Sequence, residues 1–277
     1  GAFDSTVVLY YNRPLLAALD IAPPESIDDA WSWAAFLEVL RKVKAARPDV
    51  MPLETFFVWG GEWLPYAFLP VLWSGDGRVL SPDGSTADGY LNGPESVQAL
   101  TEWQTLFLEK LTDRNAPAGT FEKGKAAMAW GIFNRWPIYR DAEVDFGMSP
   151  LPGIDRPVSP SGSWCWGLTT ACRHKEAAAT VLRGLLHPEH GIEPICRANG
   201  GIPSRASAIE RMPTYKETRG LFIAQARQTA RPRPRTPHYA VVSRELSRAL
   251  SDIANGSDPK TRLDAAVKGI DAVLKHP

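Results

Sequence analysis

Cysteine is scarce in this 277-residue sequence, and its scarcity limits the kinds of fold that the chain can adopt. The three cysteines, Cys165, Cys172 and Cys196, form no pair at Cys-x-x-Cys spacing. Their odd number and wide spacing exclude a disulfide framework of the kind that holds small secreted domains together. We therefore expect free, mostly buried thiols and a fold held by a hydrophobic core.

A net charge of either sign is also lacking, because 31 lysines and arginines balance 31 aspartates and glutamates. A nucleic-acid-binding protein carries a basic excess, so the balance argues against a nucleic-acid partner. The charge is nevertheless uneven, since residues 201–250 hold ten bases and three acids. In that stretch, prolines separate Arg231, Arg233 and Arg235. This pattern favours a solvated, extended connector over an anion-binding patch.

Long hydrophobic runs are missing as well. The longest uncharged apolar run, residues 63–75, contains Pro65 and Pro70 and is shorter than the ~20 residues that a membrane-spanning helix needs. Residues 1–5 have neither the basic start nor the apolar core of a signal peptide. We expect no membrane span. Two interpretations are left, namely that the chain is cytoplasmic and that its leader has been removed.

Signatures of catalysis and cofactor binding are absent from the sequence. It contains no P-loop, HExxH, GxSxG or zinc-ribbon pattern. His187 and His190 are three residues apart, but Pro188 between them favours a helix start over a metal site. We therefore expect no catalytic residue, no metal and no cofactor. A glycan-acting hydrolase is the alternative from the enzyme class. Its two carboxylates must be close in space but not in sequence, so their spacing in the sequence does not exclude it.

Hydrophobic periodicity predicts short strands that alternate with helices. The expected strands are residues 7–11, 51–59, 126–130, 146–151 and 164–170. The expected helices are residues 33–43, 63–73, 97–111, 177–186, 242–253 and 263–274. This alternation is typical of an α/β fold with many local crossovers.

Tryptophan is plentiful, with ten residues in the chain. Four of them lie in or beside expected amphipathic helices and are predicted to be core residues, namely Trp31, Trp33, Trp73 and Trp103. The others lie at loops and strand ends, namely Trp59, Trp63, Trp130, Trp136, Trp164 and Trp166. A ring in such a place is either half-buried packing or a platform for the flat C–H face of a sugar. Glu62, between Gly61 and Trp63, is either a polar partner for such a sugar or a plain surface carboxylate.

Five segments in a fixed order carry a resemblance to a known family. They are VLYYNRPL at 8–15, FEKGKAAMA at 121–129, DFGMSPLP at 145–152, HKEAAA at 174–179 and NGGIPSR at 199–205. Together they resemble the family 1 extracellular solute-binding proteins. The pattern of residues 239–274 is similar to the last two helices of that family.

The resemblance implies an α/β fold of the periplasmic-binding-protein type II kind, in which two lobes close on a ligand like a flytrap. It implies that residues 1–160 and 214–277 form the second lobe, with residues 1–7 as a crossover strand. Residues 161–213 would be a returning fragment of the first lobe. The second lobe would therefore be complete, and the first lobe only partial.

The resemblance also implies a function, which is the binding of a mono- or oligosaccharide without catalysis. The sugar would be delivered to the membrane permease of an ABC importer by a periplasmic or extracellular protein, secreted or lipid-anchored. The alternatives are another solute, a truncated inactive protein, and the hydrolase. A polyamine would need acids facing the cleft, and an anion would favour Arg205. Self-association through the incomplete first lobe is a further expectation.

Carried over by position, the resemblance marks the ring of Phe133 and its neighbours as one sugar-stacking segment. Trp59 and Trp63 flank a second one, Trp164 lies at the hinge, and His238 stands where a sugar-binding member places a stacking tryptophan. The expected ligand-binding residues are Trp59, Glu62, Trp63, Trp130, Phe133, Asn134, Trp136, Trp164, Arg205 and His238.

Overall fold

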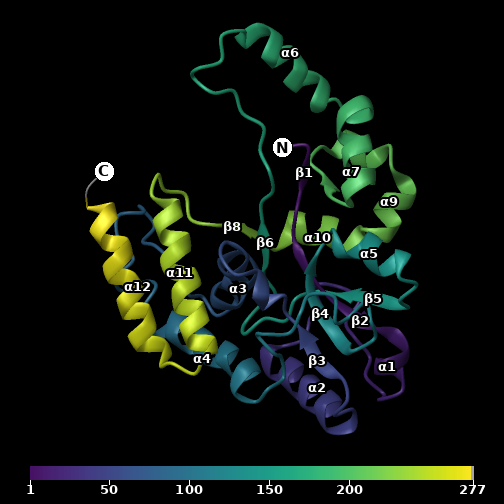
Figure 1. The fold of residues 1–277 in the computed structure, drawn as a ribbon, viewed down its shortest axis with the longest axis vertical. Helices are drawn as coiled ribbons and strands as arrows, with labels where there is room; N and C mark the ends of the chain where they lie inside the picture. The colour runs from purple at the N-terminus through teal and green to yellow at the C-terminus, as the bar shows by residue number, and fades with distance from the viewer. Residues whose placement is uncertain (276–277) are drawn as a thin grey trace.

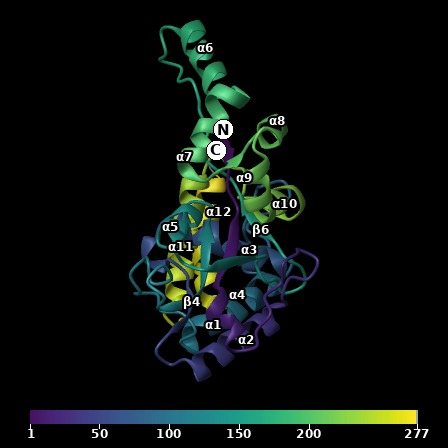
Figure 2. The ribbon, with the colours of Figure 1, turned by 90° about the vertical axis from the view of Figure 1, so that its right-hand side faces the viewer.

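The computed structural model describes residues 1–275, which form a rounded body with an arm standing above it (Figures 1 and 2). A four-stranded sheet in the order β3-β4-β2-β5 lies at the centre of the body. Its strands are β2 (Val7–Asn12), β3 (Met51–Glu54), β4 (Ala126–Ile132) and β5 (Phe146–Ser149). β2 runs antiparallel to β4 and β5, whereas β3 runs parallel to β4. The α/β fold expected from the sequence is confirmed.

Alternate residues of β2 enter two different hydrophobic cores, because successive side chains of a strand point to opposite faces. Val7 and Leu9 join the larger core, whereas Val8 and Tyr10 join the smaller one. Both faces of the sheet are thus covered, which explains why the strand is apolar along its length.

Among the helices of the body, five long ones contribute to the larger core, and two others contribute to the smaller one. The five are α2 (Trp33–Ala46), α3 (Trp63–Ser74), α4 (Pro94–Leu108), α11 (Tyr239–Ala254) and α12 (Pro259–Leu274). The two are α5 (Arg135–Asp141) and α10 (Gly220–Gln228). The short α1 (Arg13–Ala17) follows β2 directly and has a proline in its first turn, as expected.

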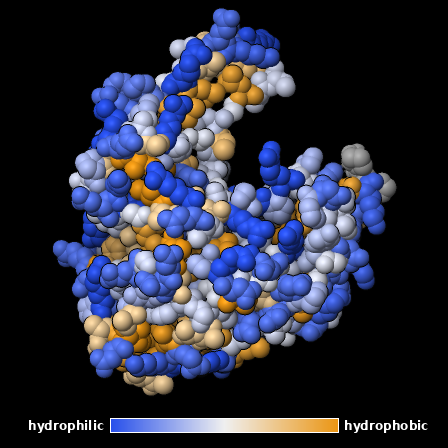
Figure 3. Space-filling view, turned by 180° about the vertical axis from the view of Figure 1, so that it is seen from behind, coloured by the Kyte–Doolittle hydropathy of each residue, from blue (hydrophilic) through white to orange (hydrophobic). Residues whose placement is uncertain are grey.

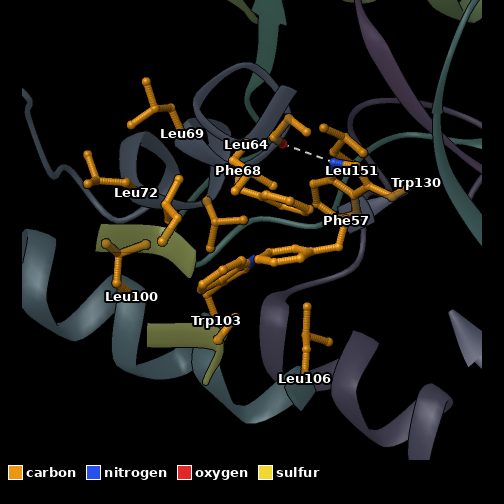
Figure 4. Close-up of a cluster of buried hydrophobic side chains, with 14 of the residues drawn as sticks. Phe57, Leu64, Phe68, Leu69, Leu72, Leu100, Trp103, Leu106, Trp130 and Leu151 are labelled. Carbon is orange, nitrogen blue, oxygen red and sulfur yellow. Dashed lines mark hydrogen bonds between the residues drawn. The ribbon is translucent and has the colours of Figure 1, made fainter. Parts of the chain in front are cut away.

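Helix α3 is the central helix of the body, and every residue from Leu64 to Ser74 is buried. A helix that is apolar all round belongs inside a protein, so its weak periodicity in the sequence follows from its place. Phe68 on α3 packs between Trp103 of α4 and Trp130 of β4, with ring centroids 5.1 and 6.2 Å away (Figure 4).

The arm leaves the body through β6 (Ser159–Ser161), which pairs in parallel with β8 (Ala230–Pro232). It continues through α6 (Lys175–Leu185), a π-helical turn at Pro188–Ile192 and α7 (Glu193–Asn199). It returns through β7 (Ile202–Pro203), which pairs with β1 (Phe3–Asp4), and then through α8 (Ala206–Glu210) and α9 (Pro213–Thr218). Ala2, Ile192, Cys196, Ala208 and Met212 form its small core.

Two of the expected strands need correction. Residues 164–170 form no strand, and Trp164 and Trp166 are 82% and 51% exposed. The strand expected at 51–59 ends at Glu54, because Phe56 takes a left-handed backbone conformation (φ 52°) and a 3₁₀ turn, η1 (Phe57–Trp59), follows. The other predicted strands and helices are confirmed within a few residues at their ends.

The outer part of the arm exposes apolar side chains. Helix α6 buries none of its residues, and Leu168 and Val181 are 44% and 62% exposed. In the space-filling view the arm overhangs a hollow beside the body, and hydrophobic residues gather along the arm (Figure 3). Within residues 1–275, no helix combines the length and the apolar character that crossing a bilayer requires.

Candidate ligand-binding cleft

A cleft of 460 Å³ lies where the arm joins the body. It is formed by the ends of β1, β4, β6 and β8 and by the start of α3. Its lining residues are Phe3, Ser5, Trp59, Glu62, Trp63, Tyr66, Ile132, Phe133, Asn134, Gly162, Ser163, Trp164 and Arg233. Strand ends and helix starts are natural positions for a site, because the elements behind them hold the loops in place.

Aromatic rings line the cleft, and packing fixes the positions of Trp59 and Trp63. Trp59 is 39% exposed and stacks on Phe56 at 4.5 Å, while Trp63 meets it edge-on at 4.8 Å. The indole nitrogen of Trp63 donates a hydrogen bond of 3.1 Å to the carbonyl oxygen of Thr55. Rigid aromatic faces of this kind suit a ligand with flat apolar surfaces.

Glu62 is the centre of a polar network at one edge of the cleft. Nη1 of Arg233 lies 3.0 Å from its Oε1, and the hydroxyl of Tyr239 donates to the same oxygen at 2.7 Å. The hydroxyl of Ser243 donates to Oε2. The network ties the start of α3 to the start of α11 and to the connector after β8. Since three donors already satisfy Glu62, its negative charge is compensated within the protein.

Arg233 reaches across the wall of the cleft to a second tyrosine. Its guanidinium carbon lies 4.9 Å from the ring centre of Tyr66, a cation–π contact. The hydroxyl of Tyr66 is hydrogen-bonded to that of Ser5 at 2.5 Å. Burial raises the pKa of Tyr66, so the phenol is protonated at neutral pH.

Gly162 lets the guanidinium of Arg233 come close to the backbone. Its φ is +134°, a conformation that side-chain-bearing residues rarely adopt. A Cβ atom at this position would lie 2.8 Å from Nη2 of Arg233. The glycine therefore serves both the turn after β6 and the position of the arginine.

Two lining side chains offer hydrogen-bonding groups to a ligand. The hydroxyl of Ser163 is buried and has no hydrogen-bond partner among the residues that the structure describes. Asn134 follows β4, and its amide oxygen accepts only a long hydrogen bond of 3.4 Å, from Arg135. Aromatic faces beside a few convergent polar groups form the lining expected of a small-molecule site.

The structure brings together six of the ten residues predicted from the sequence, namely Trp59, Glu62, Trp63, Phe133, Asn134 and Trp164. Trp130 does not line the cleft, because its side chain is 1% exposed. Its indole nitrogen donates a hydrogen bond of 3.0 Å to the carbonyl oxygen of Ala67 inside the larger core (Figure 4). Trp130 is therefore a core residue, and its place in the expected site needs correction.

Three other predicted residues also lie outside the lining. Trp136 packs toward α10, where the guanidinium carbon of Arg219 lies 3.5 Å from its ring centre. Arg205 is exposed at the start of α8 on the arm. His238 precedes α11, and it is the next residue, Tyr239, that reaches Glu62.

Arg233 is the main lining residue that the sequence did not indicate as a ligand-binding residue. The prediction that this segment is a solvated connector is wrong at Arg233, because its side chain is 24% exposed and paired with Glu62. Phe3, Ser5 and Tyr66 were not foreseen either. The polar hydroxyl of Tyr66 within an otherwise apolar helix was the one available signal for it.

Comparison with known proteins places this chain in a family. The sequence profile of the bacterial extracellular solute-binding proteins matches residues 1–190. The chain belongs to this family. The resemblance to this family that the sequence indicated is thereby confirmed. No curated relative matches the chain.

Solved structures of solute-binding proteins share the fold. The chain is similar to the cyclic alpha-maltosyl-1,6-maltose binding protein from Arthrobacter globiformis, with a TM-score of 0.79, 22% identity, and 100% and 72% of the two chains covered. It is similar to a solute-binding protein from Thermotoga lettingae bound with alpha-D-tagatose, with a TM-score of 0.82, 18% identity and coverage of 98% and 71%. It is also similar to a maltose/maltodextrin-binding domain from Bdellovibrio bacteriovorus bound to maltotriose, with a TM-score of 0.79, 20% identity and coverage of 99% and 72%. The expected solute-binding-protein fold is thus confirmed.

Proposed function

We propose that this chain binds a carbohydrate, without catalysis, in the cleft between the arm and the body. The observation that carries the proposal is the group of four aromatic residues, Trp59, Trp63, Phe133 and Trp164, that line one hollow. Sugars present flat C–H faces that stack on such rings, and their hydroxyls can meet Ser163 and Asn134. The sugars named for the structural neighbours support the same ligand class.

The charges of the cleft favour a neutral sugar over a polyamine or an anion. Among the described lining residues, Glu62 is the single carboxylate and Arg233 the single cation, and they neutralise each other. A polyamine would need uncompensated acids. Arg205, the residue suited to an anion, is exposed outside the lining.

Hydrolysis of a glycan is disfavoured by the same arrangement. A glycosidase uses two carboxyl groups on either side of the scissile bond, and Glu62 has no such companion in the described lining. We therefore infer binding without turnover. Incubation with labelled oligosaccharides should release no product, and time-dependent release that depends on Glu62 would contradict this.

We propose that the bound sugar is handed to the permease of an ABC importer by a protein that works in the periplasm or outside the cell, secreted or lipid-anchored. In this proposal residues 1–160 and 214–277 belong to one lobe, and residues 161–213 to the other. The small separate core of the arm, with Ile192 and Cys196, supports that division.

The exposed apolar residues of the arm lead us to propose that the 277-residue chain self-associates. Sedimentation should show a mass that rises with concentration, because Trp164 and Trp166 are solvent-exposed in the single chain. Trp166→Ser should weaken the association. A concentration-independent monomer would contradict the proposal.

Isothermal titration of a series of neutral oligosaccharides tests the proposed function. Saturable binding that weakens when a cleft ring is removed supports it.

A further inference from the structure

A second hollow of 360 Å³ lies on the other side of the connector that follows β8. Its walls are the C-terminal end of α3, the loop of residues 78–84 and residues 231–235. This hollow takes Arg231 from β8 and Arg235 from the connector, whereas Arg233 between them lines the cleft. The two hollows therefore share one segment of chain but no lining residue.

Positive charge predominates in this second hollow. Arg78, Arg231 and Arg235 line it, and Asp83 is the one lining carboxylate within residues 1–275. Asp83 is turned into its own loop, where Oδ1 accepts hydrogen bonds from the hydroxyl of Ser81 and from both the backbone nitrogen and the hydroxyl of Ser85. The lining thus contains three arginines and a single carboxylate, which its own loop already satisfies.

Asp76, a neighbouring carboxylate, favours the charged form of Arg231 and relieves this excess only in part. Arg156, close to the hollow, forms an ion pair with Asp76, which leaves Asp76 largely neutralised. No carboxylate within residues 1–275 forms an ion pair with Arg78, Arg231 or Arg235, whereas Arg233 in the same connector has Glu62. Of the three arginines in residues 231–235, Arg233 is therefore compensated by a carboxylate, and Arg231 and Arg235 are not.

Arg231 is the least exposed of the three arginines that line the hollow. Its guanidinium carbon lies 5.6 Å from the ring centre of Trp73, which is 4% exposed at the end of α3. Burial lowers the pKa of Arg231, and the positive charges of Arg156 and Arg78 lower it further. An anion bound beside Arg231 would offset both costs.

We propose that this hollow is an oxyanion-binding site, in which Arg78, Arg231 and Arg235 hold a phosphate or sulfate group. The planar guanidinium fork donates two hydrogen bonds to such a group, which is the reason that arginine is the usual residue at these sites. The site is separate from the sugar cleft and does not depend on the proposed function. A phosphate group could belong to a free anion or to a lipid headgroup, and the test distinguishes these sources.

The test titrates the whole chain with inorganic phosphate and with sulfate by calorimetry, using chloride at equal ionic strength as the reference. Saturable binding is expected, weakened about tenfold or more in Arg231→Gln because a charged donor is lost. Arg227→Gln removes an equal charge from an exposed position on α10, outside the hollow, and should bind like the wild type. Arg235→Gln, at an exposed position, repeats the test without disturbing the contact with Trp73.

Co-sedimentation with phosphatidylglycerol vesicles identifies the source of the group. Vesicle binding that is lost in both Arg231→Gln and Arg235→Gln assigns the site to a lipid headgroup, and phosphate binding without vesicle binding assigns it to a free anion. The proposal is overturned if neither phosphate, sulfate nor vesicles bind above the chloride reference. It is equally overturned if the Arg227→Gln control loses as much affinity as the two hollow variants.

Discussion

Nη1 of Arg233 lies 3.0 Å from Oε1 of Glu62, which joins two segments that are far apart in the sequence at the edge of one cleft. Glu62 precedes the first turn of α3, and Arg233 lies in the connector that leads to α11. Tyr239, in the first turn of α11, donates to the same carboxylate. This contact fixes the wall against which we propose that the sugar binds.

Glu62→Gln tests the contribution of this pair. The amide keeps an acceptor for Tyr239 but loses the charge that holds Arg233. Since the two side chains are 45% and 24% exposed, the free energy of unfolding should fall by about 1 kcal/mol or less. Sugar affinity should fall about tenfold, because Arg233 is no longer fixed in the wall.

Glu38→Gln is the matched control for that experiment. Glu38 forms an ion pair with Arg41 on the surface of α2, outside the cleft lining. Denaturant unfolding and calorimetry should show wild-type affinity for this variant. Equal affinity in all three proteins would mean that the pair with Arg233 does not shape the site.

Gly162→Ala tests the close approach of Arg233 to the backbone. The φ of +134° should cost about 1–3 kcal/mol of stability with any side chain present. The new methyl group should also displace the guanidinium from Glu62 and weaken sugar binding. Gly167→Ala is the control, because a Cβ atom there would meet no atom within 4 Å. If both variants melt and bind alike, the glycine has no special role.

Trp130→Leu and Trp59→Ala should have opposite effects. Trp130 is 1% exposed in the core, so its replacement should lower the free energy of unfolding by about 3 kcal/mol while the folded protein keeps its sugar affinity. Trp59 is 39% exposed on the cleft, so its loss should weaken binding with little effect on stability. Chemical denaturation and calorimetry on both variants measure this. A large loss of affinity with unchanged stability in Trp130→Leu would reverse the assignment.

Periodicity predicts most of the body because it reports which face of an element is buried. Trp33, Phe36, Leu37, Leu40 and Val43 recur at helical spacing, and α2 forms where they indicate. The apolar pattern of residues 164–170 resembles that of a strand, but a strand also needs a partner. None lies beside this segment in the part of the chain that the structure describes.

The candidate site could be predicted only in part, for a related reason. Trp59, Trp63 and Trp164 stand out because large rings occur at loop ends. Trp130 looks the same in sequence, yet both faces of its strand are buried, so alternation does not indicate exposure. Arg233 meets Glu62 only through the tertiary fold, and no local pattern reports such a contact.

Removal of single cleft rings, measured by calorimetry with neutral oligosaccharides, tests the central claim most directly. Each of Trp59→Ala, Trp63→Ala, Phe133→Ala and Trp164→Ala should weaken binding by about 1–3 kcal/mol, by analogy with the stacking of bases on aromatic side chains. Trp166→Ala is the control, because Trp166 is 51% exposed but does not line the cleft, and its affinity should match the wild type. Unchanged affinity in all four cleft variants with the fold intact, or no saturable binding by the wild type, would contradict the account.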